Sequence, residues 1–137
     1  MKFTIQTKGH SDMLDITKEV EKVLYESKVK SGIALVFTAH STAAITVAEY
    51  ENGVVNDLGR ALDEIAPEEA EYDHHKLMSD SNGAAHVKAA IIGPDLAIPV
   101  ENGELELGAW QQIIFIDFDD KPREREVIVK IIADAVS

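Results

Sequence analysis

The sequence has no cysteine, and this absence excludes three kinds of chemistry. A chain without cysteine forms no disulfide bond, has no thiol nucleophile and offers no thiolate to a zinc ion. Any metal ion must therefore bind through nitrogen or oxygen atoms, which are supplied by histidine, carboxylate and amide side chains.

Long apolar segments are missing as well. No apolar run approaches the roughly 20 residues that a membrane-spanning helix needs. The first twelve residues, MKFTIQTKGHSD, lack the basic start and long apolar stretch of a secretory signal. We therefore expect a cytoplasmic protein with no membrane partner.

Positive charge is scarce. The chain has 13 Lys and Arg residues against 25 Asp and Glu residues, which gives a formal net charge of −12. A surface of this sign repels phosphate backbones, so we expect no nucleic-acid partner. A small cationic pocket for one phosphorylated compound stays compatible with the same net charge.

The hydrophobic pattern predicts a single α+β domain over residues 1–137. Alternating or continuous apolar residues predict strands at 2–7, 33–38 and 41–50, and several further strands between 96 and 133. Apolar residues at helical spacing predict two to three helices, within 15–32, 52–67 and 82–94. Because a strand meander ends the chain, we expect mostly antiparallel pairing.

The last of these helices has clear end signals. Asn82 is placed to cap its N-terminus, and the Gly-Pro pair at 93–94 is placed to end it. Val87, Ala90 and Ile91 predict its buried stripe. On the helix within 52–67, Val54, Leu58, Leu62 and Ile65 predict the corresponding stripe.

Three of the five histidines lie in one polar stretch, HHKLMSDSNGAAH, at 74–86. His86 falls on the predicted helix, whereas His74 and His75 fall on a loop before it. Because histidine titrates near neutral pH and is the commonest metal ligand, this gathering permits a metal site without requiring one. The alternative interpretation is a solvated loop beside one helical histidine.

A second candidate group follows His40. If the strand at 41–50 continues to its end, Glu49 lies on the same face as Ala43 and Ile45, where a carboxylate needs a cation, a metal ion or a raised pKa. Glu49 is then a candidate base or ligand. If the strand ends earlier, the Glu49 side chain points to water. Ser41 and His40 form no catalytic pair, because neighbouring strand residues point to opposite faces.

Two further groups allow two interpretations each. Trp110 and Gln111 are candidates for the wall of a binding site, or Trp110 belongs to the core. Arg123 and Arg125 share one face of a strand and could bind a phosphate, or they belong to an exposed edge strand with alternating charges.

Taken in order, the motifs HSTAAITVAEYEN, YDHH, NGAAHVKAAIIGP and IPVENGELELGAWQQIIFIDFDDKPRER resemble the YjbQ-like family, whose members carry the label secondary thiamine-phosphate synthase. The resemblance implies a fold with a two-sheet, sandwich-like core. It also implies a homotrimer with clustered histidines near the subunit contacts. One departure is GAW, where relatives often have G-T-W.

The resemblance implies roles for particular residues. His40, His74 and His86 match the family's histidine positions and suit one divalent metal ion, zinc or another transition metal, with magnesium as the usual escort of a pyrophosphate substrate. Because His75 follows His74, either ring could point inward. His40 and Glu49 are the expected catalytic residues. The expected substrate contacts are Ser41, Thr42, Asn52, Asn82, Trp110, Gln111, Arg123 and Arg125.

The implied activity joins a hydroxymethylpyrimidine pyrophosphate to a thiazole phosphate and releases pyrophosphate. Three histidines suit a metal ion that activates water better than they suit magnesium, so this synthesis could be a side activity. The alternatives are a metal-dependent hydrolase of a small phosphorylated or acylated compound, and a trimeric metal- or ligand-binding protein without turnover.

Overall fold

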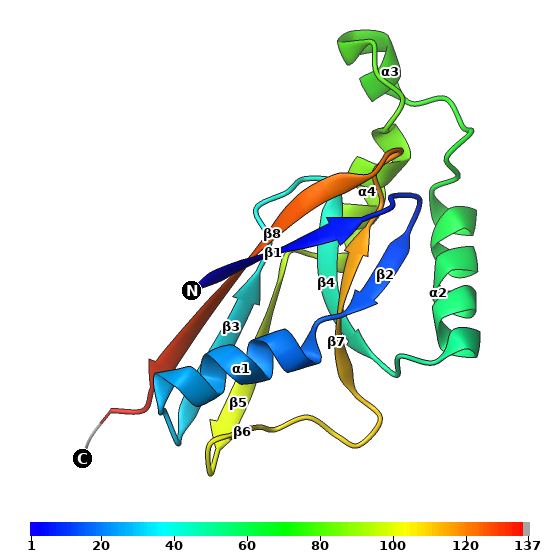
Figure 1. The fold of residues 1–137 in the computed structure, drawn as a ribbon. Helices are drawn as coiled ribbons and strands as arrows, with labels where there is room; N and C mark the ends of the chain where they lie inside the picture. Colours follow the sequence, from blue (N-terminus) through cyan, green and yellow to red (C-terminus); the bar gives the residue numbers. More distant parts are fainter. Residues whose placement is uncertain (136–137) are drawn as a thin grey trace.

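A computed structural model describes residues 1–135, which form two antiparallel sheets and four helices (Figure 1). The larger sheet has the strand order β1 (Lys2–Thr7), β8 (Arg123–Ala133), β3 (Gly32–Phe37), β5 (Asp95–Glu101) and β6 (Glu104–Leu105). The smaller sheet has the order β2 (Asp12–Asp15), β7 (Gln112–Asp117) and β4 (Ala43–Ala48). The helices are α1 (Thr17–Ser27), α2 (Asn52–Ile65), α3 (Asp73–Met78) and α4 (Gly83–Ile92). The prediction of an antiparallel α+β fold is confirmed.

The elements are layered around the smaller sheet. One of its faces packs on the larger sheet and α1, through a core that includes Ile16, Val20, Val36, Ile45, Phe115, Val127 and Val129. Its other face packs on α2 and α4. Both faces of β7 are therefore buried, and every residue from 113 to 119 lies in the interior. Burial on two faces explains why β7 is a continuous apolar run rather than an alternating one.

Several element ends follow from local chemistry. The carboxylate of Glu51 accepts hydrogen bonds from the backbone N–H groups of Gly53 and Val54, and so caps the N-terminus of α2. α1 ends at Ser27, earlier than the predicted stop at Gly32, because Lys28 adopts a left-handed conformation with φ 61°.

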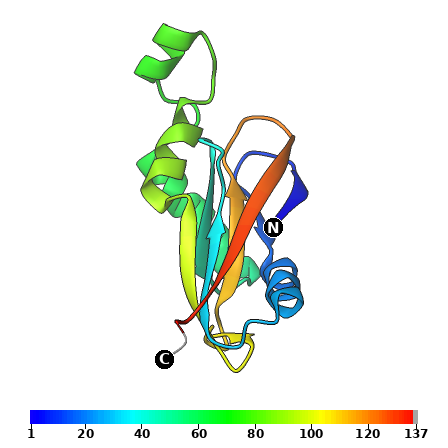
Figure 2. The ribbon, with the colours of Figure 1, turned by 90° about the vertical axis from the view of Figure 1, so that its left-hand side faces the viewer.

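Two predictions about α3 and β4 need correction. His74 and His75 lie on α3, a short helix that was predicted as a loop and that protrudes from the body of the molecule (Figures 1 and 2). β4 ends at Ala48, so Glu49 lies beyond the strand and is partly exposed. The interpretation of Glu49 as a carboxylate on the buried strand face is therefore wrong.

α4 turns a different face inward from the predicted one. Val87 and Ile91 are 39% and 53% exposed, whereas Lys88 is only 1% exposed. The small residues Ala85 and Ala89 of α4 pack against the smaller sheet, and Nζ of Lys88 lies 2.5 Å from Oδ1 of Asp63 on α2. On α2, Leu62 is buried as predicted, but Ile65 is exposed.

Of the helices within residues 1–135, none has the length and apolar character needed to cross a bilayer.

Candidate functional site

The polar centre of the molecule is a buried ion pair between the two sheets. Arg125 on β8 donates to Asp117 at the end of β7, from Nε at 2.7 Å and from Nη2 at 2.8 Å. The hydroxyl of Thr7 on β1 donates to the same carboxylate at 2.5 Å. Burial raises the pKa of Asp117, but the hydrogen bonds from Arg125 and Thr7 outweigh it, so the pKa is lowered overall. Asp117 therefore stays ionised inside the protein.

A second buried carboxylate, Asp119, lies beside this pair. Its Oδ2 accepts a hydrogen bond from the Thr42 hydroxyl at 3.0 Å, and Thr42 in turn accepts one from Arg125 at 2.7 Å. Burial raises the pKa of Asp119, but hydrogen bonds from the Asp120 backbone and from Thr42 outweigh it and bring the pKa to about 2. We call Thr7, Thr42, Asp117, Asp119 and Arg125 the carboxylate cluster.

The side chain of Arg123 is more exposed than that of Arg125. Its Nη2 lies 3.2 Å from Asp119, while its Nε has no hydrogen-bond partner among the described residues. The side chain is 38% exposed, against 6% for Arg125. Because β8 lies between β1 and β3, the interpretation of these arginines as part of an exposed edge strand is wrong. The Nε atom of Arg123 is itself buried, so a ligand would meet the exposed end of the guanidinium, whereas Arg125 holds the fold.

The carboxylate cluster is connected to the histidines. The Asn82 amide donates to Asp119 at 3.5 Å, and its oxygen lies 3.1 Å from His74 Nε2. His74 Nε2 is also 2.8 Å from the carboxylate of Asp80. Because both neighbours are acceptors, His74 Nε2 carries a proton. The His74 and His86 rings lie 4.6 Å apart. These contacts form one chain from Arg123 through Asp119 and Asn82 to two imidazoles.

His75 has a structural contact of its own. Its Nε2 accepts the backbone N–H of Gly83 at 2.8 Å, and its ring packs against Tyr72. This contact attaches α3 to the first turn of α4. It also occupies an amide that an anion at this helix end would need, and Asn82 makes no side-chain cap because its oxygen faces His74. Asn82 is thus the N-cap residue of α4, as predicted, but its side chain makes no capping hydrogen bond.

His40 lies on the other side of the carboxylate cluster. Its Nε2 accepts the backbone N–H of Glu126 at 3.1 Å. Burial lowers the pKa of His40, and the positive charge of Arg125 lowers it further. His40 is therefore a neutral imidazole in this structure. Its neighbour Ser41 is exposed in the turn before β4.

The predicted metal ligands are only partly brought together. His74 and His86 are neighbours, but His40 is engaged with Glu126, and the ring contacts among residues 1–135 do not include it. Within the same residues, no three His, Asp or Glu side chains are arranged to hold one ion. A three-histidine site does not fit the described arrangement, so we derive no chemical step through a metal.

The remaining predicted site residues lie at the other end of the smaller sheet. In the β4·β7 register, Ala43 faces Asp117 and Ala48 faces Gln112. Five residue steps of about 3.3 Å separate these ends by about 16 Å. Glu49 follows β4 and Asn52 begins α2 at the Gln112 end. One chain therefore holds two groups of motif residues apart.

Trp110 and Gln111 belong to this second group. Trp110 is 73% exposed, so its assignment to the core is wrong. The Gln111 side chain accepts the backbone N–H of Gly108 at 2.8 Å, within its own loop. An exposed indole at the head of β7 is available to a ligand or to another copy of the chain.

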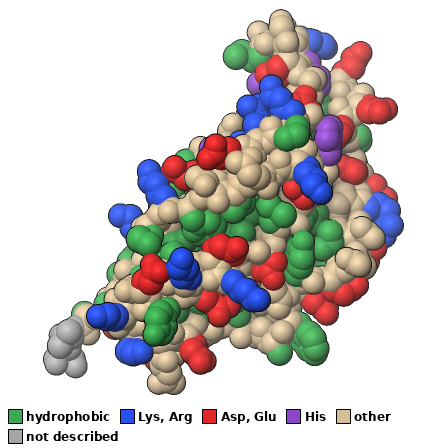
Figure 3. Space-filling view, in the orientation of Figure 1, with side chains coloured by type: hydrophobic (Ala, Val, Ile, Leu, Met, Phe, Trp, Pro, Cys, Tyr) green, Lys and Arg blue, Asp and Glu red, His purple; other side chains and the backbone are tan. Residues whose placement is uncertain are grey.

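The surface near the histidines is polar. Histidine side chains reach the surface near α3, among acidic and basic side chains (Figure 3). A hollow of about 200 Å³ beside Asn82 is lined by carboxylates, including Glu68, Glu69 and Asp120, and does not suit a phosphate. A phosphate would instead approach from the side of Arg123.

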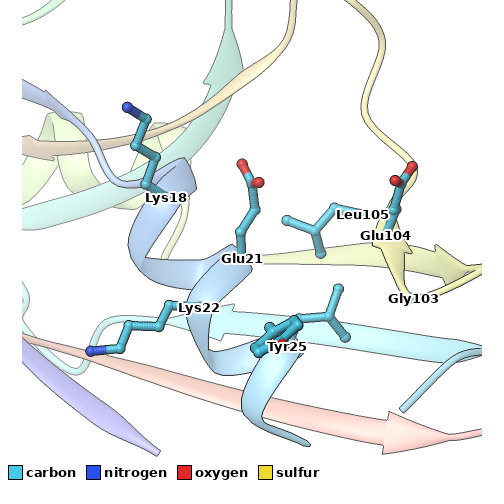
Figure 4. A pocket seen from close by; sticks show the side chains of 8 residues that line it. Lys18, Glu21, Lys22, Tyr25, Gly103, Glu104 and Leu105 are labelled. Carbon is cyan, nitrogen blue, oxygen red and sulfur yellow. The ribbon is translucent and has the colours of Figure 1, made fainter. Parts of the chain in front are cut away.

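A larger hollow, of about 590 Å³, lies far from the histidines along α1 and the β5–β6 hairpin (Figure 4). Its lining includes Lys18, Glu21, Lys22 and Tyr25 on α1 and Glu104 on the hairpin. Its charges balance, and none of its lining residues is a catalytic candidate from the sequence.

Asp117 and Asp119 are the site residues that sequence reasoning missed. They occur in IDFDD, where they resemble the polar end of a strand. The available signal was a carboxylate at every second position of a strand otherwise too apolar to face water, with arginines at the same spacing in the next strand.

Comparison with known proteins gives consistent matches over nearly the whole chain. The family model described as UPF0047 protein YjbQ-like matches residues 1–134. The UPF0047 protein YugU of Bacillus subtilis is 42% identical over 128 residues, which cover 93% of this chain and 94% of that protein. A UPF0047 protein of Archaeoglobus fulgidus is 39% identical over 130 residues, which cover 95% and 98%.

Solved structures of related proteins also match this chain over nearly its whole length. A yjbq/upf0047 family protein from Clostridium acetobutylicum has a TM-score of 0.88 and 38% identity, with 96% of this chain and 99% of that chain covered. The hypothetical protein APE1520 of Aeropyrum pernix has a TM-score of 0.91 and 33% identity, with 98% of each chain covered. None of these four names states an activity.

Proposed function

This chain belongs to the YjbQ-like UPF0047 family, and on that premise we propose that it is an enzyme acting on a small phosphorylated compound. The single observation that carries the proposal is the contact chain from Arg123 through Asp119 and Asn82 to His74 and His86. It places a partly free guanidinium and two imidazoles on one polar surface. Phosphate groups are bound by this combination of donors.

The reaction that the family label suggests suits these groups. In it, a thiazole nitrogen forms a bond to the methylene carbon of a pyrimidine pyrophosphate. The bond between that carbon and the pyrophosphate oxygen breaks, and its electron pair leaves with the pyrophosphate. The main catalytic task is therefore to stabilise the departing anion.

Each residue of the contact chain has a role in this task. Arg123 binds the pyrophosphate through the exposed end of its guanidinium, and Asp119 holds the guanidinium in place. Asn82 and Asp80 accept the hydrogen bonds from His74 Nε2 and so fix the orientation of the ring. His86 lies next to that ring and extends the polar surface. The ion pair of Arg125 with Asp117 fixes the two sheets behind this surface.

We also propose that the protein is a homotrimer and that its site is completed between copies. Within one chain, Glu49, Asn52 and Trp110 lie at the opposite end of the smaller sheet from the histidines. In an assembly, the two ends of neighbouring copies can meet. A small, open surface in the single chain would then become a closed site.

The alternative is hydrolysis, with water in place of the thiazole. The observation that favours it is the adjacency of the His74 and His86 rings, because an imidazole can take a proton from an attacking water. The two functions differ in their products. Synthesis gives a joined compound plus pyrophosphate, and hydrolysis gives a free alcohol plus pyrophosphate, or phosphate.

Binding of pyrophosphate tests the proposal directly. We expect the wild-type protein to bind pyrophosphate in calorimetric titration, and Arg123→Gln to lower the affinity by about tenfold or more. Arg60→Gln is the matched control, because Arg60 is an exposed arginine on α2 paired with Asp57. Equal affinities in all three proteins would overturn the proposed site. Incubation with both substrates, with mass detection of products, then separates synthesis from hydrolysis.

A further inference from the structure

The chain passes between the two sheets at two neighbouring corners. Residues 8–11, the first corner, connect β1 of the larger sheet to β2 of the smaller one. Residues 118–122, the second corner, connect β7 of the smaller sheet to β8 of the larger one. The two corners lie side by side (Figure 1), because β1 pairs with β8 and β2 pairs with β7. The second corner contains Asp119 and leads directly to Arg123, so its position decides where the proposed phosphate-binding guanidinium lies.

The first corner has an unfavourable backbone conformation. Its three consecutive residues Gly9, His10 and Ser11 have positive φ angles of 80°, 54° and 65°. Glycine adopts this left-handed region freely, whereas the Cβ atoms of His10 and Ser11 make it unfavourable. Residues in such conformations persist only where their surroundings fix them, and they concentrate at functional sites. The contacts that fix this corner therefore indicate what it supports.

The first corner is fixed against the backbone of the second corner. The His10 N–H group donates to the carbonyl oxygen of Asp119 at 2.7 Å. Gly9 is buried, and a Cβ atom added to it would lie 2.8 Å from the same oxygen and 2.7 Å from the carbonyl oxygen of Lys121. Thr7, just before the corner, is opposite Arg123 in the β1·β8 register. The main chain around Asp119 and Arg123 is thus held from the side of the first corner.

The side chain of His10 reaches a third segment. Its Nδ1 lies 3.1 Å from both carboxylate oxygens of Glu68, so this nitrogen carries a proton. Glu68 lies in the connection between α2 and α3, and α3 carries His74. The first corner therefore contacts both halves of the proposed site, the half with Arg123 and Asp119 and the half with the histidines.

The direct contact between these two halves is weak. The Asn82 amide nitrogen lies 3.5 Å from Asp119, at the limit of a hydrogen bond. Beside it, the Ser81 hydroxyl donates to Asp120 of the second corner, and that contact is exposed to water. Because the direct contacts are few, a support that touches both halves has a large share in setting the separation of the guanidinium and the imidazoles.

We infer that the first corner is a positioning element of the phosphate site, an inference that rests on the function proposed above. Gly9 and the His10 backbone fix Asp119 and, through it, the guanidinium of Arg123. The pair of His10 with Glu68 fixes the connection that leads to His74. Gly9 and His10 are positioning residues, because they act on the phosphate only through the groups that they hold.

Gly9→Ala tests the backbone support, with Gly93→Ala as the matched control. Both glycines have positive φ angles, 80° and 101°, but a Cβ atom at Gly93 would meet no atom within 4 Å apart from its chain neighbours. Calorimetric titration with pyrophosphate should show binding about tenfold weaker in Gly9→Ala and unchanged in Gly93→Ala. The titration is made at a temperature at which circular dichroism shows both variants folded. Lost stability alone leaves the affinity of the folded protein unchanged, so equal affinities overturn the inference.

His10→Gly tests the side-chain contact, with Ser11→Gly as its control. Glycine suits a positive φ angle at both positions, so both variants should fold even if Gly9→Ala does not. Of the two side chains, the His10 ring is the one bonded to Glu68. We expect His10→Gly to weaken pyrophosphate binding about threefold, which is within the range of a partly exposed pair, and Ser11→Gly to leave it unchanged. Equal affinities in these two variants overturn the role of the pair.

Arg123→Gln separates this inference from the proposed function. If Arg123→Gln loses affinity while Gly9→Ala and His10→Gly bind as the wild type does, the phosphate site stands and the first corner has no positioning role. A wild type that binds no pyrophosphate overturns the proposed function and this inference together. Weaker binding in Gly9→Ala and His10→Gly, with both control variants unchanged, supports the inference.

Discussion

Arg125 and Asp117 join the two sheets of this protein through two hydrogen bonds of 2.7 and 2.8 Å between almost fully buried side chains. Arg125 comes from the larger sheet and Asp117 from the smaller one. The pair fixes the position of Thr42 and Asp119, on which Arg123 and Asn82 depend. The Arg125–Asp117 pair therefore contributes both to the stability of the fold and to the geometry of the proposed site.

Asp117→Asn should destabilise the fold by about 3–5 kcal/mol, because it leaves the Arg125 guanidinium buried without its counter-charge. Urea unfolding followed by circular dichroism measures this loss. Asp57→Asn, which removes the exposed partner of Arg60, should change the free energy of unfolding by about 0.5 kcal/mol or less. A similar loss in both variants would contradict the role given to the buried pair.

The stability contributed by Asp119 should depend on pH. Its pKa in the folded protein is about 2, below the ordinary value of a free aspartate. The ionised form is thus favoured by folding, and its contribution is complete above about pH 5 and is lost as pH falls towards 2. The difference in unfolding free energy between wild type and Asp119→Asn should shrink over that range. A difference that is constant from pH 7 to pH 2.5 would argue against this coupling.

Metal binding stays a prediction that titration with zinc or cobalt can test. His74→Ala and His86→Ala should each weaken binding strongly, since these rings are neighbours, and His40→Ala decides whether the third imidazole joins them on binding. Occupancy in the wild type should fall as pH drops through the imidazole range, because ligands must be deprotonated. His10→Ala, far along the chain, and His75→Ala are the controls. Unchanged metal content in every variant would mean that the histidines only hold α3.

Gly83→Ala should loosen α3. An alanine Cβ at this position would lie 2.6 Å from the Tyr72 Cβ and 2.9 Å from His75 Nε2, so α3 must shift. The expected loss is about 1–3 kcal/mol, with faster proteolysis within 73–80. Gly59→Ala on α2 is the control, since its Cβ meets only the Met13 side chain, at 3.8 Å. There the substitution should be neutral or stabilising by up to about 1 kcal/mol.

Glu49→Gln should leave stability within about 0.5 kcal/mol of wild type and lower turnover, since Glu49 is partly exposed and serves no described fold contact through its side chain. Glu51→Ala provides the contrast. Its carboxylate caps α2, so its loss should cost about 1 kcal/mol while turnover persists. Unfolding curves and product formation, measured on the same preparations, decide between the two roles. Full activity in Glu49→Gln would remove Glu49 from the site.

Strands and helices with a simple pattern could be predicted from the sequence. β1 has the predicted bounds, and β3 starts one residue before the predicted strand. The pattern failed on α4, where Val87 and Ile91 point outward and Lys88 points inward. Small residues let α4 approach the sheet closely, and Lys88 is tolerated because Asp63, 25 residues away in sequence, neutralises it. No local pattern reveals such a partner.

The candidate site could be predicted only in part, because some of its contacts also join residues that are distant in the sequence. His74, His86, Asn82 and Arg123 could be named from motifs, and the structure connects them. The buried carboxylates that hold them could not be told from a polar strand end, since their burial depends on how two sheets meet. The register of β4 with β7 decides which motif residues lie at opposite ends of the smaller sheet. The motifs alone do not contain that register.

β7 is bonded to a neighbour on each edge and buried on both faces. Its backbone amides therefore exchange with deuterium only when the whole molecule opens, whereas those of α3 exchange through local opening. The exchange rate at Ile114 and Phe115 thus reports the free energy of opening the whole molecule, and the rate at Leu77 and Met78 reports the free energy of detaching α3. Both exchange rates can be measured on a single sample. One experiment therefore compares the opening of the whole molecule with the detachment of α3.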